Sequence, residues 1–194
     1  GQEALGESLL RLGNFEKGVL ELRNFPDGET YIRVHSEVKD AQVVILCQFH
    51  QPDAKVLPLL LLVGTLRDLG VHSVGLVAPY LAYMRQDKIF NEGEGISARY
   101  FARLLSQQFD WLLTVDPHLH RIHALSEVYS MPALALTAVH PIAAWLRANI
   151  AKPIVIGPDG ESEQWAVQVA KAAACPCEVL TKERFGDHDV RVSL

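Results

Sequence analysis

Ser73-Val74-Gly75-Leu76-Val77-Ala78 is a strand-like, mostly apolar run that leads into Pro79-Tyr80 and, a few residues later, into the polar group Arg85-Gln86-Asp87-Lys88. A second apolar run, residues 111–115, is followed directly by Asp116-Pro117-His118. Short, continuous apolar runs are typical of strands in a parallel sheet, because helices cover such a sheet on both faces. Open α/β sheets bind ligands at the carboxyl ends of their strands, so we expect both polar groups at one ligand-binding edge.

Strand and helix patterns alternate along the chain. Helical spacing of apolar residues predicts helices over residues 3–12, 53–69, 97–108, 141–149 and 163–174, and short apolar runs predict strands over residues 19–22, 31–34, 42–47, 73–78, 111–115, 154–156 and 178–180. The first two strands flank the turn Phe25-Pro26-Asp27-Gly28-Glu29 as a hairpin. This alternation predicts an α/β fold with mostly parallel sheets, flanked by helices and joined by right-handed crossovers.

The chain is long enough for two modest domains. A boundary between Ala135 and Pro141, with a capping residue at Thr137, predicts a first domain over residues 1–137 and a second over residues 138–194. The second domain holds few predicted strands, and a two-stranded parallel sheet is too small to stand alone.

Composition excludes several classes of protein. The 194 residues are 49% hydrophobic and 21% charged, the balance of a compact soluble protein rather than a disordered or fibrous one. A net charge of −5 argues against general binding to nucleic acid or to anionic lipid. The most apolar window, residues 56–66, is too short to cross a membrane. The cysteines, only 3 in number, favour a reducing compartment and predict a cytoplasmic protein, and Cys175-Pro176-Cys177 falls short of a zinc site.

Loops after the predicted strands carry the candidate functional residues. Arg85 offers a guanidinium fork for phosphate oxygens, and the amide of Gln86 could read the edge of a ring, although a solvated helix start would explain the same charges. Asp116 and His118 lie two residues apart, so on an extended segment their side chains share one face and could ligate a divalent cation or orient a phosphate. A polar loop that opens a helix is the plainer alternative for this histidine-rich stretch.

Three further loops are open to a structural and to a functional interpretation. Gly157-Pro158-Asp159-Gly160 is first of all a turn signal, yet its carboxylate could accept hydrogen bonds from sugar hydroxyls. The segment 182–188 is either an exposed flexible loop or one whose cations, Lys182 and Arg184, close over a transferring phosphoryl group. The turn over residues 25–29 is either a plain turn or an aromatic with two carboxylates that contact a nucleobase. Because four of the five loops follow predicted strands, they would line one edge.

Together these stretches resemble the ribose-phosphate diphosphokinase family, the synthetases of 5-phosphoribosyl 1-diphosphate. Five segments occur in the family's order and at about its spacing, namely Phe25–Glu29, Pro79–Asp87, Asp116–His118, Pro158–Gly160 and Lys182–Arg184. The resemblance implies two phosphoribosyltransferase-like domains with mostly parallel sheets. The second domain would be incomplete, because the sequence ends before the family's turn for the 5-phosphate.

The resemblance also implies how ATP is held. Phe25, Asp27 and Glu29 would reach the adenine and ribose of ATP bound to a neighbouring subunit, whereas Arg85-Gln86-Asp87 would hold ATP within their own subunit. The ATP site would then need an oligomer.

For the reacting groups, the resemblance places His118 at the Mg-ATP phosphates and Asp159 at the hydroxyls of ribose 5-phosphate, and it makes both of them candidate ligands of Mg²⁺. Lys182 and Arg184 would lie on a mobile loop that covers the reaction, so these two and His118 are the catalytic candidates.

The implied reaction transfers the β,γ-diphosphoryl group of Mg-ATP to the anomeric hydroxyl of ribose 5-phosphate and releases AMP. Mg²⁺ is the implied cofactor, and the implied assembly is a homo-oligomer without a nucleic-acid or membrane partner. A non-catalytic regulatory or assembly paralogue is one alternative, against which the retained Lys182, Arg184 and His118 argue. A phosphoribosyltransferase that consumes the diphosphate is the other, against which Arg85-Gln86 and Phe25 argue.

Overall fold

The computed structural model describes the backbone of residues 2–160, 162–184 and 190–193. It divides into two compact units, unit 1 over residues 1–136 and unit 2 over residues 137–194. Within the described residues, the helices are all too short or too polar to cross a membrane.

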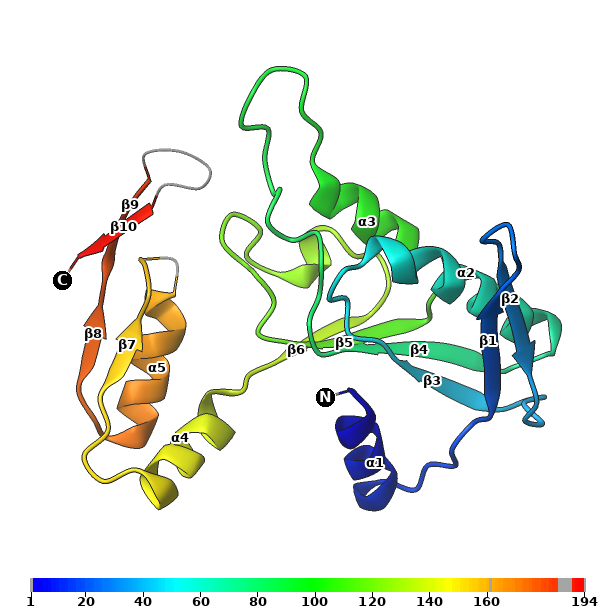
Figure 1. Ribbon diagram of the computed structural model, residues 1–194, viewed down its shortest axis with the longest axis horizontal. Coiled ribbons are helices and arrows are strands. Elements are labelled where there is room, and N and C mark those ends of the chain that lie inside the picture. Colours follow the sequence, from blue (N-terminus) through cyan, green and yellow to red (C-terminus); the bar gives the residue numbers. More distant parts are fainter. Residues whose placement is uncertain (1, 161, 185–189, 194) are drawn as a thin grey trace. The chain divides into compact units, whose positions relative to one another are not determined.

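Unit 1 is built on a four-stranded parallel sheet with the strand order β3-β4-β5-β6 (Figure 1). Its elements in chain order are α1 (Gln2–Leu12), β1 (Leu20–Asn24), β2 (Thr30–Val34), β3 (Gln42–Leu46), α2 (Asp53–Asp68), β4 (Ser73–Ala78), α3 (Ser97–Ser106), β5 (Trp111–Val115), the short 3-10 helix η1 (Leu125–Glu127) and β6 (Ala133–Leu136). Strands β1 and β2 form a separate antiparallel hairpin. The predicted α/β fold with mostly parallel sheets flanked by helices is confirmed, whereas η1 and β6 have no counterpart among the predicted elements.

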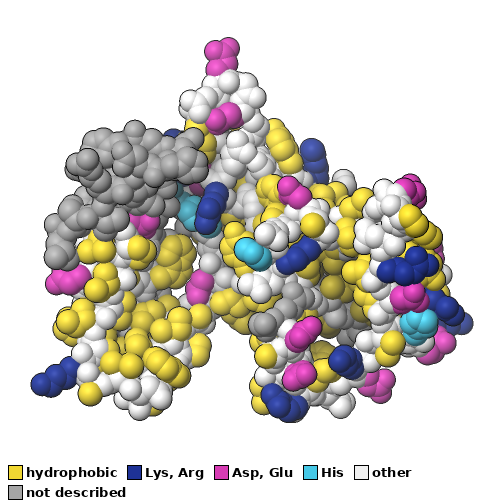
Figure 2. All heavy atoms as spheres, in the orientation of Figure 1, with side chains coloured by type: hydrophobic (Ala, Val, Ile, Leu, Met, Phe, Trp, Pro, Cys, Tyr) yellow, Lys and Arg dark blue, Asp and Glu magenta, His cyan; other side chains and the backbone are white. Residues whose placement is uncertain are grey.

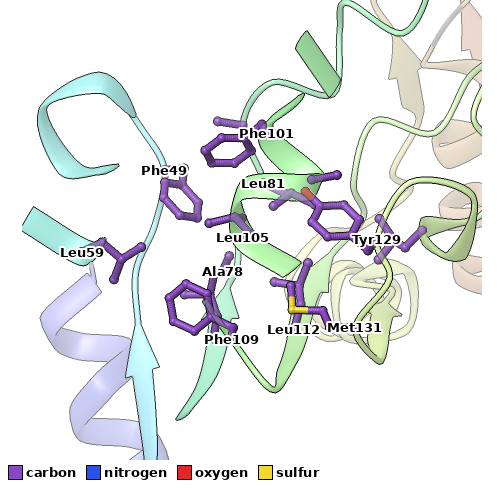
Figure 3. Close-up of a cluster of buried hydrophobic side chains, with 14 of the residues drawn as sticks. Phe49, Leu59, Ala78, Leu81, Phe101, Leu105, Phe109, Leu112, Tyr129 and Met131 are labelled. Atoms are coloured by element: carbon purple, nitrogen blue, oxygen red, sulfur yellow. The ribbon is translucent and has the colours of Figure 1, made fainter. Parts of the chain in front are cut away.

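The order of the strands decides which face of the sheet the helices cover. Each strand pairs with the one before it, and right-handed crossovers in one direction place their helices on the same face. Figure 1 shows α2 and α3 together on one side of the sheet. Their apolar side chains meet Val74, Leu76 and Ala78 of β4, all fully buried, in the core drawn in Figure 3. This packing holds the carboxyl ends of β4 and β5 in place.

The opposite face of the sheet is less completely covered. Helix α1 lies on this side (Figure 1), and a methyl group at Gly6 would come within 3.6 Å of Leu46. The indole of Trp111 lies across Gly75 on the neighbouring strand, with which it is paired in register. On β6, Leu134 and Leu136 remain 55% and 45% exposed.

Unit 2 contains a two-stranded parallel sheet and a two-stranded antiparallel one. Its elements are α4 (Val139–Asn149), β7 (Val155–Gly157), α5 (Glu163–Ala173), β8 (Cys177–Val179), β9 (Thr181–Arg184) and β10 (Val190–Ser193). Helix α5 packs against β7, β8 and α4, and its C-cap residue Ala174 adopts a left-handed conformation with φ 56° and ψ 47°. At the start of α4, the Thr137 hydroxyl accepts a hydrogen bond from the Val139 amide.

The expectation of a loop from residue 182 onward is wrong at its first residues. Residues 181–184 form β9, which pairs with β10 through the register Lys182↔Val192 and Arg184↔Val190. The four residues of β9 are all polar, so the sequence lacks the run of apolar residues by which a strand is predicted. The strand is formed by backbone hydrogen bonds to β10.

Candidate functional site

Two loops follow adjacent strands of the unit 1 sheet. The β4 loop, residues 79–96, joins β4 to α3 and forms the long green excursion in Figure 1, and the β5 loop, residues 116–124, leads from β5 toward η1. Since β4 and β5 pair in parallel, both loops leave the sheet at the same edge. They carry the segments Arg85-Gln86-Asp87 and Asp116-Pro117-His118.

The first part of the β4 loop is anchored in the core. Leu81, Ala82 and Met84 are buried. Tyr83 has a positive φ of 61°, its ring lies 4.7 Å from that of Phe101, and its hydroxyl donates to the Asp53 carboxylate. That hydrogen bond raises the pKa of Tyr83, since it holds the proton against a carboxylate. The chain therefore reaches Arg85 with little freedom.

Arg85, Gln86 and Asp87 then take three different directions. Arg85 is exposed, and within the described residues its guanidinium has no carboxylate partner. The side-chain oxygen of Gln86 accepts the Ser97 hydroxyl, and its backbone carbonyl accepts the Ala98 amide at 3.3 Å. The amide of Gln86, expected to read a ring edge, is thus partly engaged at the start of α3.

Asp87 is turned inward and joins the two loops. Its side chain is 1% exposed, its Oδ1 accepts from Arg121 Nη1 at 3.0 Å, and its Oδ2 accepts from the Arg121 backbone amide at 3.2 Å. Although desolvation acts to raise the pKa of Asp87, the hydrogen bonds and charge of Arg121 outweigh it and hold that pKa below its ordinary value. In this conformation Asp87 contacts Arg121 rather than solvent, so it supports the loop instead of presenting its carboxylate to a ligand.

His118 lies half-buried in the β5 loop, with its ring centroid 6.3 Å from that of His120. The expectation that Asp116 and His118 share one face rested on an extended backbone, and it is wrong at Asp116, which has a φ of 40°. Across the described residues there is no group of three or more His, Cys, Asp or Glu side chains that could hold a metal ion.

Sequence reasoning missed two residues that shape the β4 loop. Glu94 closes the tip, because its Oε2 accepts the amides of Phe90 and Asn91 at 2.8 and 3.0 Å. Arg121, besides its bond to Asp87, places its guanidinium carbon 5.5 Å from the centre of the exposed Phe90 ring. A turn-closing Glu three residues after Asn is a local signal that could have been used, whereas no local pattern marks Arg121.

The turn at residues 25–29, between β1 and β2, is separate from the β4 and β5 loops. Phe25 is 41% exposed and packs edge-on against Tyr31, with the Arg23 guanidinium over both rings. Asp27 accepts the Glu29 amide at 3.1 Å. In Figure 1 the hairpin stands beside α2, at the end of the sheet where β3 and β4 begin, whereas the β4 and β5 loops follow the ends of their strands. Figure 2 shows both signs of charge interspersed over this part of unit 1.

Unit 2 contains the remaining candidates. Asp159 is half-buried between β7 and α5, and its Oδ1 accepts the Ser162 amide at 3.0 Å, so one role of this carboxylate is to close the turn that leads into the helix. Lys182 and Arg184 lie on β9, and their side chains, together with residues 185–188 of the expected loop, fall outside the described part of the chain.

Comparison with known proteins identifies the family. The N-terminal domain of ribose phosphate pyrophosphokinase matches residues 1–108. Ribose-phosphate pyrophosphokinase of Methanobrevibacter smithii is 33% identical over 177 residues, which cover 90% of this chain and 58% of that protein. The same enzyme of Pyrococcus abyssi is 31% identical over 194 residues, which cover 99% of this chain and 65% of that protein.

A solved structure supports the fold. Phosphoribosylpyrophosphate synthetase from Mycobacterium smegmatis superimposes with a TM-score of 0.80 at 21% identity, over 100% of this chain and 64% of that chain. This chain thus spans 58–65% of the length of these relatives. With the family match over more than half of its residues, the chain belongs to the ribose phosphate pyrophosphokinase family.

Proposed function

We propose that the protein transfers the diphosphoryl group of Mg-ATP to ribose 5-phosphate, giving 5-phosphoribosyl 1-diphosphate and AMP. The observation that carries this proposal is the pair of loops at the carboxyl edge of the unit 1 sheet. The β4 loop lies within the segment matched by the family, and it keeps Arg85 exposed directly after the buried residues Leu81, Ala82 and Met84. A guanidinium in that position provides a planar fork for phosphate oxygens. His118, on the adjacent loop, supplies a second nitrogen donor.

In this reaction the main task of the protein is to position its substrates. In phosphoryl transfer the attacking and leaving oxygens are in line and charge spreads over the phosphoryl oxygens, so catalysis depends on orientation and on fixed positive charge. Arg85 would orient the nucleotide phosphates, and the imidazole of His118 would donate a hydrogen bond to them. The buried residues Leu81, Ala82 and Met84 anchor the part of the loop that precedes Arg85.

The residues of unit 1 fit a magnesium ion that arrives with the nucleotide rather than a resident ion. The described residues offer no cluster of ligands, and Mg²⁺ in such enzymes keeps water and phosphate oxygens as most of its ligands. Asp116, an oxygen donor two residues before His118, is the side chain we expect nearest to it. When bound, Mg²⁺ neutralises charge on the phosphoryl oxygens.

We further propose that the adenine is held by a neighbouring subunit through Phe25, Asp27 and Glu29. An exposed aromatic beside two carboxylates can stack on a base and accept its donors. The hairpin stands where the strands begin, whereas Arg85 follows the end of a strand, which favours a second subunit as the source of the hairpin at each site. The assembly would then be a homo-oligomer.

The ribose 5-phosphate side rests on unit 2. Asp159 would accept hydrogen bonds from sugar hydroxyls, and Lys182 and Arg184 would supply positive charge near the transferring group. These three assignments come from the family resemblance and from position in the chain.

The test is AMP release from Mg-ATP in the presence of ribose 5-phosphate, with the full-length protein that contains this chain. Arg85→Ala and Phe25→Ala should each reduce the rate by about a hundredfold or more, because each removes one half of a site. Co-expression of the two variants should restore activity, since mixed oligomers contain some sites with both halves intact. Arg103→Ala, which removes an exposed arginine on α3, is the matched control and should leave the rate unchanged.

A folded, oligomeric protein that releases no AMP would contradict the proposed reaction and favour a non-catalytic paralogue. Activity in the parent protein without recovery in the mixed oligomers would leave the reaction standing and refute the shared site.

A further inference from the structure

We propose that Arg121 is a positioning residue, which holds the β4 loop against the β5 loop and so fixes the distance between Arg85 and His118. This inference rests on the proposed function for its consequence, nucleotide affinity, but its physical content is a contact within unit 1. Neither Asp87 nor Arg121 needs to touch the nucleotide.

Arg121 contacts the β4 loop at two residues, Asp87 and Phe90. The guanidinium and backbone amide of Arg121 bind the carboxylate of Asp87, and the guanidinium also lies over Phe90, three residues further along the same loop. Asp87 sits two residues after Arg85, and Arg121 sits three residues after His118. A change in this contact therefore moves the two proposed phosphate-binding side chains relative to each other.

Because Asp87 is buried, its carboxylate depends on Arg121. A carboxylate that is 1% exposed is largely desolvated, and the hydrogen bonds and opposite charge of Arg121 offset that cost and hold its pKa below the ordinary value. Without the guanidinium, the loop must open to solvate Asp87 or the carboxyl must take up a proton. In either case the attachment of the β4 loop to the β5 loop is weakened, because the backbone amide of residue 121 holds Asp87 without the help of the guanidinium.

The same sheet offers a matched control at its other end. Arg67 Nη2 donates to Asp110 Oδ2 at 2.7 Å, and that oxygen also accepts the Val74 amide at 2.6 Å. This second ion pair ties the end of α2 and the start of β4 to the start of β5, so it is on the opposite edge of the sheet from the two loops. Like Arg121, Arg67 has a partly exposed side chain.

The first experiment measures the binding of Mg-ATP to the full-length protein by calorimetry without ribose 5-phosphate. Arg121→Ala should raise the Kd on the order of tenfold, because it removes the guanidinium but keeps the backbone amide bond to Asp87. Arg121→Lys, which cannot hold Asp87 and Phe90 with one planar group, should fall between the parent and the alanine variant. Arg67→Ala should lower the melting temperature yet leave the Kd within about twofold of the parent.

A cycle with Asp87→Asn separates positioning from direct contact with ATP. If Arg121 acts through Asp87, the Kd for Mg-ATP of the double variant Arg121→Ala/Asp87→Asn should be no higher than the higher Kd of the two single variants. Additive losses would show that Arg121 or Asp87 meets the nucleotide directly, and would overturn the inference.

The second experiment needs no ligand, so it stands even if the protein binds no ATP. Amide hydrogen exchange over residues 85–98 should be faster in Arg121→Ala than in the parent, and unchanged in Arg67→Ala. Unchanged exchange in Arg121→Ala, or an equal increase in both variants, would refute the positioning role. Failure to bind Mg-ATP together with faster exchange would refute the proposed function and leave the contact established.

Discussion

Replacing Gly75 with alanine should destabilise unit 1, because the space for a methyl group is already occupied. A Cβ at this position would lie 2.0 Å from Cε2 and Cζ2 of Trp111 and 2.6 Å from its Cη2. Non-bonded carbon atoms normally approach no closer than about 3.5 Å, so the indole must leave its place on the sheet. Overpacking of this kind costs about 1–3 kcal/mol, while the lower backbone entropy of alanine returns about 0.5–1 kcal/mol. The difference lies between about 0 and 2.5 kcal/mol, and we expect a net loss of about 1 kcal/mol, the middle of that range.

The assay is urea-induced unfolding, followed by circular dichroism and by tryptophan fluorescence. Trp111 is the single tryptophan of unit 1, so in a background with Trp145→Phe and Trp165→Phe its emission reports that unit alone. Gly64→Ala is the matched control. Gly64 lies inside α2, where a methyl group would have no atom within 4 Å, so the same substitution should stabilise by about 1 kcal/mol.

A second-site variant tests the cause. Trp111→Val removes the ring, so adding Gly75→Ala in that background should cost little or nothing, as circular dichroism can measure. A parent-like unfolding free energy for Gly75→Ala alone would refute the reasoning, and so would a full loss in the Trp111→Val background.

Two further outcomes concern stability. Ala174→Gly should raise stability by about 1 kcal/mol, because Ala174 is exposed and left-handed at the end of α5, and a higher melting temperature would register the gain. The pKa of Asp110 lies below its ordinary 3.8, since the Val74 amide and Arg67 outweigh the opposing effect of desolvation. A carboxyl whose pKa is lower in the folded state stabilises the fold above its unfolded pKa and loses that contribution as pH falls through the folded one. Asp110→Asn should therefore lose less stability than the parent between about pH 5 and pH 3, and parallel pH profiles would contradict this assignment.

Much of the fold could be predicted because it depends on local patterns. Continuous apolar runs identify β4 and β5, and helical spacing identifies α2 and α5. The strand β9 could not be found this way, because its polar residues pair with β10 through backbone groups. The strand β6 is hard to find for another reason, because its short Ala-Leu-Ala-Leu run overlaps the expected domain boundary between Ala135 and Pro141.

The candidate site was predictable to the level of its loops and no further. Position after a strand is enough to expect Arg85 and His118 at one edge of the sheet. The direction of each side chain depends on partners that are distant in sequence, as Asp87 shows, since its partner Arg121 is 34 residues away. Backbone conformation is a second limit, because the positive φ of Asp116 overrides the alternation expected of a strand.

The chain-order pairing of the parallel sheet bears on how the protein is made. As each strand pairs with the one synthesised just before it, the sheet can grow on the ribosome from β3 to β6 without waiting for a later strand. The bond between Asp87 and Arg121 closes only after β5 has emerged. Nascent chains halted before residue 121 would therefore carry a β4 loop that still lacks its attachment, and the proposed nucleotide site would mature after most of the core beneath it.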